Sequence, residues 1–123
     1  MRACIIVPTV DLETGAAVGK AAQEMAGLDC SVVVAADCEL RGDTTPTNAA
    51  MDAALAMGAD YVALLCDDVM PTDGWLARMV EALGESDRYG VAAPSGNCRT
   101  TPQCTGRPGM ERGVEVVKQL GFF

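Results

Sequence analysis

Histidine is absent from this sequence of 123 residues. Its absence excludes a Ser-His-Asp triad, a Cys-His catalytic pair and every zinc site that uses imidazole. A C-x-x-C spacing is also missing, which excludes zinc ribbons and thioredoxin-like redox motifs. Proton transfer or metal binding in this chain must therefore use carboxylates, thiols, hydroxyls, lysines or the backbone.

Long apolar runs and an excess of basic residues are missing as well. No apolar run approaches the ~18 residues of a membrane-spanning helix, and the N-terminal run stops at Pro8, too early for a secretory signal. The formal net charge is −8, from 17 acidic and 9 basic residues, whereas domains that bind nucleic acid normally carry the opposite sign. We therefore expect a soluble, cytoplasmic protein with no nucleic-acid partner and no membrane span.

The composition is that of a globular chain with one core. Half of the residues are hydrophobic and 21% are charged, and the length suits a single domain over residues 1–123. Cys4 and Cys66 lie inside apolar runs that indicate buried strands. We expect free thiols that act as small hydrophobic side chains, with Cys98 and Cys104 the pair most able to form a disulfide under oxidising conditions.

Short apolar runs alternate with longer stretches of helical periodicity. Strands are predicted over residues 3–7, 31–36, 61–65 and 90–93, and helices over 15–28, 47–57, 73–83 and 110–120. This alternation predicts right-handed βαβ units and a mainly parallel sheet. The expected fold is therefore a three-layer α/β/α, Rossmann-like domain.

Acidic residues follow three of the four predicted strands. They are Asp11, Asp37, Glu39, Asp67 and Asp68. Because the carboxyl ends of parallel strands lie at one edge of the sheet, where such folds bind ligands, these acids are expected to share one rim. Much of the negative charge would then be concentrated there.

The segment LLCDDVMPTDGWL, residues 64–76, is the sharpest local feature. A buried strand ends in the adjacent acids Asp67 and Asp68, followed by a turn and a helix that Thr72 can cap. Adjacent carboxylates repel each other, and a hard cation such as Mg²⁺ or Mn²⁺ would compensate for that repulsion. The alternative, in which both acids cap the turn or face solvent, stays open at this point.

The order of these motifs resembles the nucleotide-binding half of family 2 glycosyltransferases, which have the GT-A fold. The matching segments are IIVPTV (5–10), VVVAADCE (32–39), TNAAMDAAL (47–55), YVALLCDDVMPTDGWLARMVEAL (61–83), GVAAP (90–94) and GMERGVEVVKQLGFF (109–123). They cover nearly the whole chain. The resemblance depends on their order and spacing together, because no single motif is decisive.

The resemblance implies a role for each matching residue. Pro8 and Thr9 would lie beside the nucleotide, largely through backbone contacts, and Asp37 would read its base. Asp67 and Asp68 would hold a Mn²⁺ or Mg²⁺ ion that bridges the diphosphate, with Asp68 as the expected direct ligand. The implied activity is cation-assisted transfer of a hexose from a nucleotide-diphosphate sugar to an unknown acceptor.

Two departures from the family pattern affect this expectation. Cys66 stands where the motif often has its first acid or amide, and a thiol is a poor Mg²⁺ ligand. The sequence ends at Phe122-Phe123, before the segment in which the family carries its carboxylate base, so the catalytic base is unassigned and the acceptor subdomain is expected to be missing. Four interpretations of the chain therefore stay open: a truncated chain, a naturally minimal enzyme, a subunit completed by an oligomer or a partner, and a relic that only binds.

Two other functions fit part of the same pattern. A non-catalytic module would bind a nucleotide sugar without transferring it. A receiver-like signalling domain would share the parallel architecture, and residues 67–74 are similar to its phosphoacceptor segment. Receivers, however, carry an acidic pair where this chain has Pro8 and Thr9, and their Lys follows the last strand, whereas Lys118 lies in a predicted helix.

Overall fold

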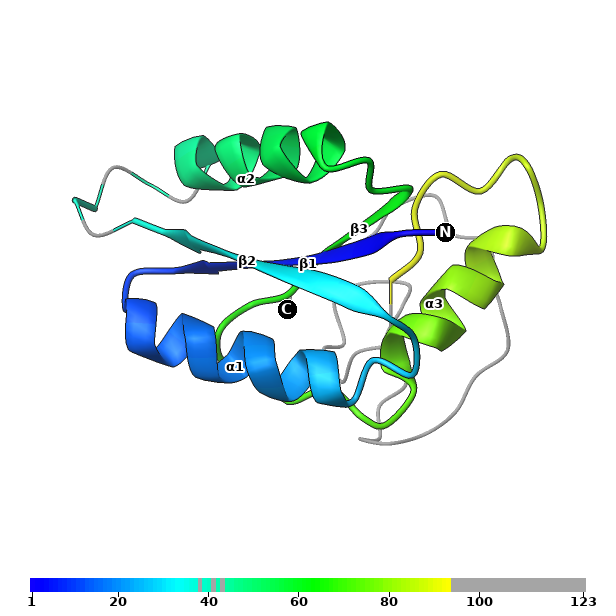
Figure 1. Cartoon of the computed structure of the whole chain (residues 1–123), viewed down its shortest axis with the longest axis horizontal. Coiled ribbons are helices and arrows are strands. Elements are labelled where there is room, and N and C mark those ends of the chain that lie inside the picture. Colours follow the sequence, from blue (N-terminus) through cyan, green and yellow to red (C-terminus); the bar gives the residue numbers. More distant parts are fainter. Residues whose placement is uncertain (38, 41, 43, 94–123) are drawn as a thin grey trace, which may run out of the picture. The chain divides into compact units, whose positions relative to one another are not determined.

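A computed structural model of the chain describes residues 1–37, 39–40, 42 and 44–93. In chain order they form β1 (Ala3–Thr9), α1 (Leu12–Glu24), β2 (Cys30–Ala36), α2 (Thr44–Ala56), β3 (Tyr61–Leu64) and α3 (Trp75–Gly84). Strands and helices alternate, which confirms the predicted α/β class (Figure 1). The chain divides into two compact units, Met1–Ala77 and Arg78–Phe123, and all three of these strands belong to the first.

β1 is the central strand of the described sheet, whose order is β2-β1-β3. Both neighbours run parallel to β1, as the sequence predicts. β2 pairs with the whole of β1, whereas β3 pairs only as far as Ile6 opposite Leu64. β1 therefore continues beyond the end of β3, and this leaves its last residues accessible to the segment that follows β3.

Helices cover both faces of this sheet, with α1 on one side and α2 on the other (Figure 1). Successive side chains of β1 point to opposite faces and so enter two separate cores. The core on the α1 side contains Ala3, Ile5, Val7, Ala22 and Ala26, and the core on the α2 side contains Cys4, Ile6, Ala50 and Ala54. A strand buried on both faces is apolar along its length, and this is why β1 is readily predicted.

Two glycines allow α1 to lie close to the sheet. Gly15 and Gly19 are both buried on the face of α1 toward the strands. A Cβ atom at Gly15 would lie 2.5 Å from Thr9 Cγ2, and one at Gly19 would lie 2.6 Å from Val32 Cγ1. Any larger side chain would push the helix outward or displace the strand residues, so the position of Thr9 depends on Gly15.

The helices do not begin where the sequence predicts. α1 begins at Leu12 rather than Gly15 because Asp11 acts as its N-cap. α3 begins at Trp75, and the Trp75 N–H donates to the Thr72 carbonyl at 3.2 Å, so Thr72 contributes its backbone to this turn. None of the helices within the described ranges has the length and apolar character that a membrane span requires.

The strand predicted over residues 90–93 is wrong. None of these residues is in a strand, and the Val91 side chain is 73% exposed. A strand must pair its backbone groups with a neighbour, and a run of four residues that starts with glycine gains little from burying side chains. Other predicted features lie outside the described residues: Cys38, Cys98, Cys104, Lys118 and the helix over 110–120.

Three of the cysteines predicted to be free thiols lie within the described residues. Cys4, Cys30 and Cys66 are not joined in disulfides, and Cys4 and Cys30 are buried as small hydrophobic side chains should be. Cys66 is exposed, so its assignment to a buried strand is wrong. The physical reason is that β3 ends at Leu64 and the chain then leaves the sheet.

Candidate functional site at the carboxyl ends of the strands

The carboxyl ends of the three strands are joined by backbone hydrogen bonds. The Asp37 N–H donates to the Thr9 carbonyl at 2.8 Å, and the Leu65 N–H donates to the Ile6 carbonyl at 2.9 Å. The order β2-β1-β3 means that the chain crosses β1 on its way from β2 to β3. In doubly wound sheets, ligands bind in the crevice at such a reversal of strand order. The candidate site therefore lies between the ends of β1 and β3.

Thr9 and Asp67 meet at this point although they are 58 residues apart in the sequence. Thr9 Oγ1 donates a hydrogen bond of 2.8 Å to Asp67 Oδ2. Thr9 is only 6% exposed, whereas Asp67 is partly buried at the surface. The segment after β3 thus turns back over the end of β1 and brings one carboxylate to the strand reversal.

The Thr9 hydroxyl is also held by the backbone of Asp11. Thr9 Oγ1 lies 2.8 Å from the Asp11 carbonyl oxygen, and the Asp11 N–H donates to Oγ1 at 3.1 Å. The Asp11 carboxylate itself accepts hydrogen bonds from the Glu13 N–H and the Thr14 hydroxyl, at 3.1 and 3.0 Å. Asp11 therefore contributes its side chain to the start of α1 and its backbone to the site.

Asp37 lies beside Thr9 and shapes the turn after β2. Its side chain is buried, at 8% exposure, and its Oδ2 accepts a hydrogen bond of 2.7 Å from the Gly42 N–H. The Leu40 N–H donates to its carbonyl at 3.1 Å. Leu40 and Gly42 both have positive φ, 53° and 97°, and Asp37 holds both of them through these hydrogen bonds.

The segment between β3 and α3 is fixed at its far end by α1. The Gly74 N–H donates to the Met25 carbonyl at 2.8 Å, and the Trp75 indole N–H donates to the Ala22 carbonyl at 2.9 Å. Gly74 approaches the turn after α1 so closely that a Cβ at Gly27 would lie 2.8 Å from its Cα. Trp75 also packs against the core on the α1 side. Trp75 thus anchors the start of α3 to that core.

The two adjacent acids differ in their surroundings. Asp67 is partly buried and bonded to Thr9, whereas the Asp68 side chain is exposed. Pro8, which precedes Thr9, is partly buried. The structure thus brings Thr9, Asp37 and Asp67 into one connected group, with Asp68 next to it in the sequence and open to solvent.

These residues fit a divalent cation only together with further ligands. Within the described ranges, no group of three or more Cys, Asp or Glu side chains is arranged to hold a metal ion. Mg²⁺ sites in enzymes commonly use one or two protein carboxylates and complete the coordination with substrate phosphates and water. The carboxylates of Asp67 and Asp68 are hard oxygen donors of that kind. Two carboxylates do not form a closed cage, so an ion held here would need ligands from outside the described residues.

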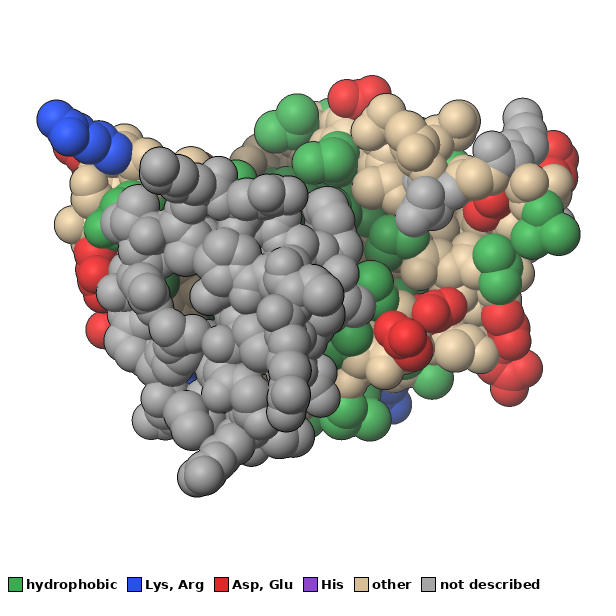
Figure 2. Space-filling view, turned by 180° about the vertical axis from the view of Figure 1, so that it is seen from behind, with side chains coloured by type: hydrophobic (Ala, Val, Ile, Leu, Met, Phe, Trp, Pro, Cys, Tyr) green, Lys and Arg blue, Asp and Glu red, His purple; other side chains and the backbone are tan. Residues whose placement is uncertain are grey.

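Three exposed apolar side chains lie in the segments that follow the strands, and their exposure was not predicted from the sequence. Val10, Leu40 and Met70 follow the ends of β1, β2 and β3, and they are 61%, 76% and 74% exposed. Figure 2 shows hydrophobic and acidic side chains intermixed on its right-hand side, where these strands end. Apolar surface beside hydrogen-bonding groups is what a ligand with a ring system requires.

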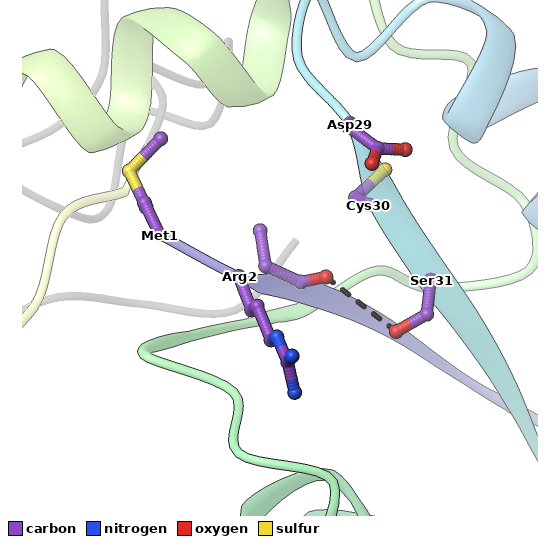
Figure 3. A pocket seen from close by; sticks show the side chains of 6 residues that line it. Met1, Arg2, Asp29, Cys30 and Ser31 are labelled. Carbon is purple, nitrogen blue, oxygen red and sulfur yellow. Dashed lines mark hydrogen bonds between the residues drawn. The ribbon is translucent and has the colours of Figure 1, made fainter.

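A pocket lies at the opposite, amino ends of β1 and β2 (Figure 3). It is lined by Met1, Arg2, Ala3, Asp29, Cys30 and Ser31. Burial, with a smaller contribution from Asp29, raises the pKa of the Cys30 thiol, which keeps it protonated and a poor nucleophile. The Arg2 guanidinium donates to the Met57 carbonyl at 3.1 Å. The Ser31 hydroxyl likewise donates to the Ala3 carbonyl at 3.5 Å, so both side chains stabilise the fold.

Comparisons with protein-family models, with curated proteins and with solved structures found no match to this chain. The resemblance to family 2 glycosyltransferases therefore depends on the order of the sequence motifs. The observed parallel α/β fold is compatible with that resemblance. The same fold is equally compatible with the other functions that doubly wound sheets carry.

Proposed function

We propose that the rim formed by the ends of β1 and β3 binds a nucleotide-diphosphate sugar with Mn²⁺ or Mg²⁺, and that the domain transfers the sugar to an acceptor. The observation that carries the proposal is the hydrogen bond from Thr9 to Asp67 at the reversal of strand order. It supports the proposal because it holds a carboxylate beside the crevice where sheets of this type bind ligands.

The proposed roles follow from the exposure of each side chain. Asp68 is exposed and would bind the cation directly, while Asp67, held by Thr9, would bind it from the strand side. A bound cation would stabilise the negative charge that develops on the leaving diphosphate. Pro8 and Thr9 would border the nucleotide through their backbone, and the loop shaped by Asp37 would flank the base.

Electrostatics makes the cation a requirement of this proposal. A diphosphate that approaches Asp67 and Asp68 brings negative charge next to two carboxylates, and like charges at that range repel strongly. A divalent ion between them converts the repulsion into two attractive contacts. Nucleotide binding at this rim should therefore be weak without Mn²⁺ or Mg²⁺ and strong with it.

The rival functions differ in the fate of the bound molecule. A non-catalytic module would bind the same nucleotide sugar and leave it intact. A receiver-like domain would accept a phosphoryl group on Asp67 with Mg²⁺. Against the receiver, the group that contacts Asp67 from the end of β1 is the neutral hydroxyl of Thr9, where a receiver has acids.

Calorimetry with UDP-, GDP- and TDP-hexoses, with and without Mn²⁺, tests the proposal directly. Wild type should bind at least one of them only when Mn²⁺ is present, and Asp68→Ala should abolish that binding. Asp52→Ala is the matched control, because it removes an exposed carboxylate from α2 and changes the net charge equally. If no nucleotide binds under any of these conditions, the proposed function is wrong.

Transfer and phosphorylation are then measured separately. Release of free UDP or GDP from a bound donor, in the presence of candidate acceptors, would support the transferase over the binding module. Incorporation of phosphate from acetyl phosphate with Mg²⁺, lost in Asp67→Asn, would support the receiver and contradict the proposed function.

A further inference from the structure

We infer that Thr9 is a positioning residue whose buried hydroxyl sets the orientation of the Asp67 carboxylate. What Asp67 then binds rests on the proposed function. The hydroxyl donates to Asp67 Oδ2 at 2.8 Å from a side chain that is only 6% exposed. Water therefore competes poorly for this hydrogen bond, and a carboxylate on a surface segment gains a fixed partner in the sheet.

The Thr9 oxygen is itself fixed by the backbone of Asp11. The Asp11 N–H donates to Oγ1 at 3.1 Å, and the Asp11 carbonyl lies 2.8 Å from Oγ1 as a second acceptor for the same proton. The oxygen therefore keeps its place whether or not Asp67 is engaged. Asp11 is in turn held as the N-cap of α1, so the donor is anchored to a helix.

The methyl group of Thr9 is fixed by α1. Gly15 leaves so little space that a Cβ there would lie 2.5 Å from Thr9 Cγ2 and 2.9 Å from Val34 Cγ1. Thr9 cannot rotate about its Cα–Cβ bond without moving its methyl or its hydroxyl out of this arrangement. The packing of α1 thus supports the side-chain conformation that the Asp11 backbone already fixes, and the hydroxyl in turn holds Asp67.

The backbone of the segment that carries Asp67 is attached on both sides of this residue, which leaves the orientation of its carboxylate to a side-chain partner. The hydrogen bonds of this segment to α1 begin at Gly74, whose N–H donates to the Met25 carbonyl. On the strand side, the Leu65 N–H donates to the Ile6 carbonyl. Between these two attachments, Val69 packs against the core on the α1 side, and the Thr9 hydroxyl acts on the Asp67 carboxylate itself.

The test compares Thr9→Val, which removes the hydroxyl and keeps the shape, with Thr9→Ser, which keeps the hydroxyl. The readout is the ¹³C resonance of the Asp67 carboxyl carbon, assigned with Asp67→Asn, together with affinity for Mn²⁺ plus UDP-hexose. Thr9→Val should move the resonance and weaken binding about tenfold. Thr9→Ser should keep the wild-type resonance and bind within about twofold of wild type.

An unmoved Asp67 resonance in folded Thr9→Val would overturn the inference. If Thr9→Val fails to fold, wild-type spectra in H₂O and D₂O decide instead. Deuterium on Thr9 Oγ1 should shift the Asp67 carboxyl carbon more than that of exposed Asp68, and equal shifts would contradict the inference. If wild type binds no nucleotide, the proposed function fails, while the resonance still decides whether Thr9 orients Asp67.

Discussion

The two ends of the sheet use charge differently. At the amino end, charged groups are paired within the fold. The Arg2 guanidinium donates to the Met57 carbonyl at the end of α2, and the Arg2 N–H donates to Asp60 Oδ2 at 2.8 Å. The N-terminal ammonium lies 3.9 Å from the same carboxylate. Positive and negative groups thus face each other at this end.

At the carboxyl end, Asp11 and Asp67 are held by neutral donors. The partners of Asp11 are an N–H and a hydroxyl, and the partner of Asp67 is the Thr9 hydroxyl. Neutral donors orient a carboxylate without bringing an opposite charge to it. Among the described residues, opposite charges thus meet at the amino end, whereas neutral groups hold two carboxylates at the carboxyl end, where the proposed function would bring a cation from solution.

Removing a carboxylate from each end gives the largest expected contrast. Asp67→Asn should weaken Mn²⁺-dependent binding of a UDP- or GDP-hexose by at least about 100-fold, because it removes a charged ligand of the cation. Asp60→Asn should leave that affinity unchanged and lower the thermal midpoint of unfolding, because it removes the negative charge that faces the Arg2 N–H and the N-terminal ammonium. Calorimetry and thermal unfolding of both variants measure the contrast. Equal losses of affinity would show that the two ends are not functionally distinct.

Gly15→Ala should disturb the carboxyl end through packing alone. The new Cβ would lie 2.5 Å from Thr9 Cγ2, and such overpacking costs about 1–3 kcal/mol of unfolding free energy. Thr9→Ser removes this methyl group, so the double variant should regain at least about 0.5 kcal/mol relative to additive single effects. Urea unfolding of all four proteins gives the coupling energy.

Gly84→Ala is the control for Gly15→Ala, since a Cβ at Gly84 meets no atom within 4 Å. It should leave the unfolding free energy within about 0.5 kcal/mol of wild type. Simple additivity of Gly15→Ala and Thr9→Ser would mean that α1 does not fix the Thr9 side chain.

The sheet could be predicted because its signals are local. The apolar run of β1 and the alternation of strands with helices indicated the class, and the acids after the strands indicated the rim. The weak prediction was the strand over 90–93, where the apolar run is short and depends on a neighbour that the sequence cannot identify. Exposure of Cys66 was missed for a related reason, since the apolar pattern continues beyond the point where β3 stops pairing.

The contacts within the site could not be predicted because they are not local. The Thr9–Asp67 hydrogen bond joins residues 58 apart, and it depends on β1 extending past β3 by a register that no motif specifies. Gly15 carried a usable signal, because Gly15 and Gly19 are four residues apart and so share one face of a helix. That spacing indicates close packing, but it does not name Thr9 as the neighbour.

The labelling rates of two cysteines probe the two ends of the sheet without an activity assay. Cys66 is exposed next to Asp67, whereas Cys30 is buried at the amino end and burial raises its pKa. Iodoacetamide at pH 7.5 should therefore label Cys66 at least about tenfold faster than Cys30, as measured by peptide mass spectrometry. Mn²⁺ with UDP- or GDP-hexose should slow labelling at Cys66 and leave Cys30 unchanged. Equal protection of both thiols would indicate a global change rather than occupation of the rim.

The pH dependence of stability tests the amino end alone. Because the pKa of Cys30 is raised above its ordinary value of 9.0, the folded state holds the thiol proton more tightly than the unfolded state does. Its contribution to stability is complete below pH 9 and is lost as the pH rises through the folded-state pKa. Chemical unfolding between pH 8 and 10.5 should show this loss in wild type and a smaller one in Cys30→Ala. If the unfolding free energy fell equally with pH in both proteins, Cys30 would not be the cause of the loss.

The smallest expected effect concerns the tether between α1 and the acidic segment. Trp75→Phe keeps an aromatic ring in the core but removes the indole N–H that donates to the Ala22 carbonyl at 2.9 Å. Loss of one neutral hydrogen bond should lower the unfolding free energy by about 1 kcal/mol. Nucleotide affinity should change less than in Thr9→Val, because the Gly74 N–H still holds the segment through the Met25 carbonyl. A larger loss of affinity in Trp75→Phe would mean that this tether, rather than Thr9, controls the position of Asp67.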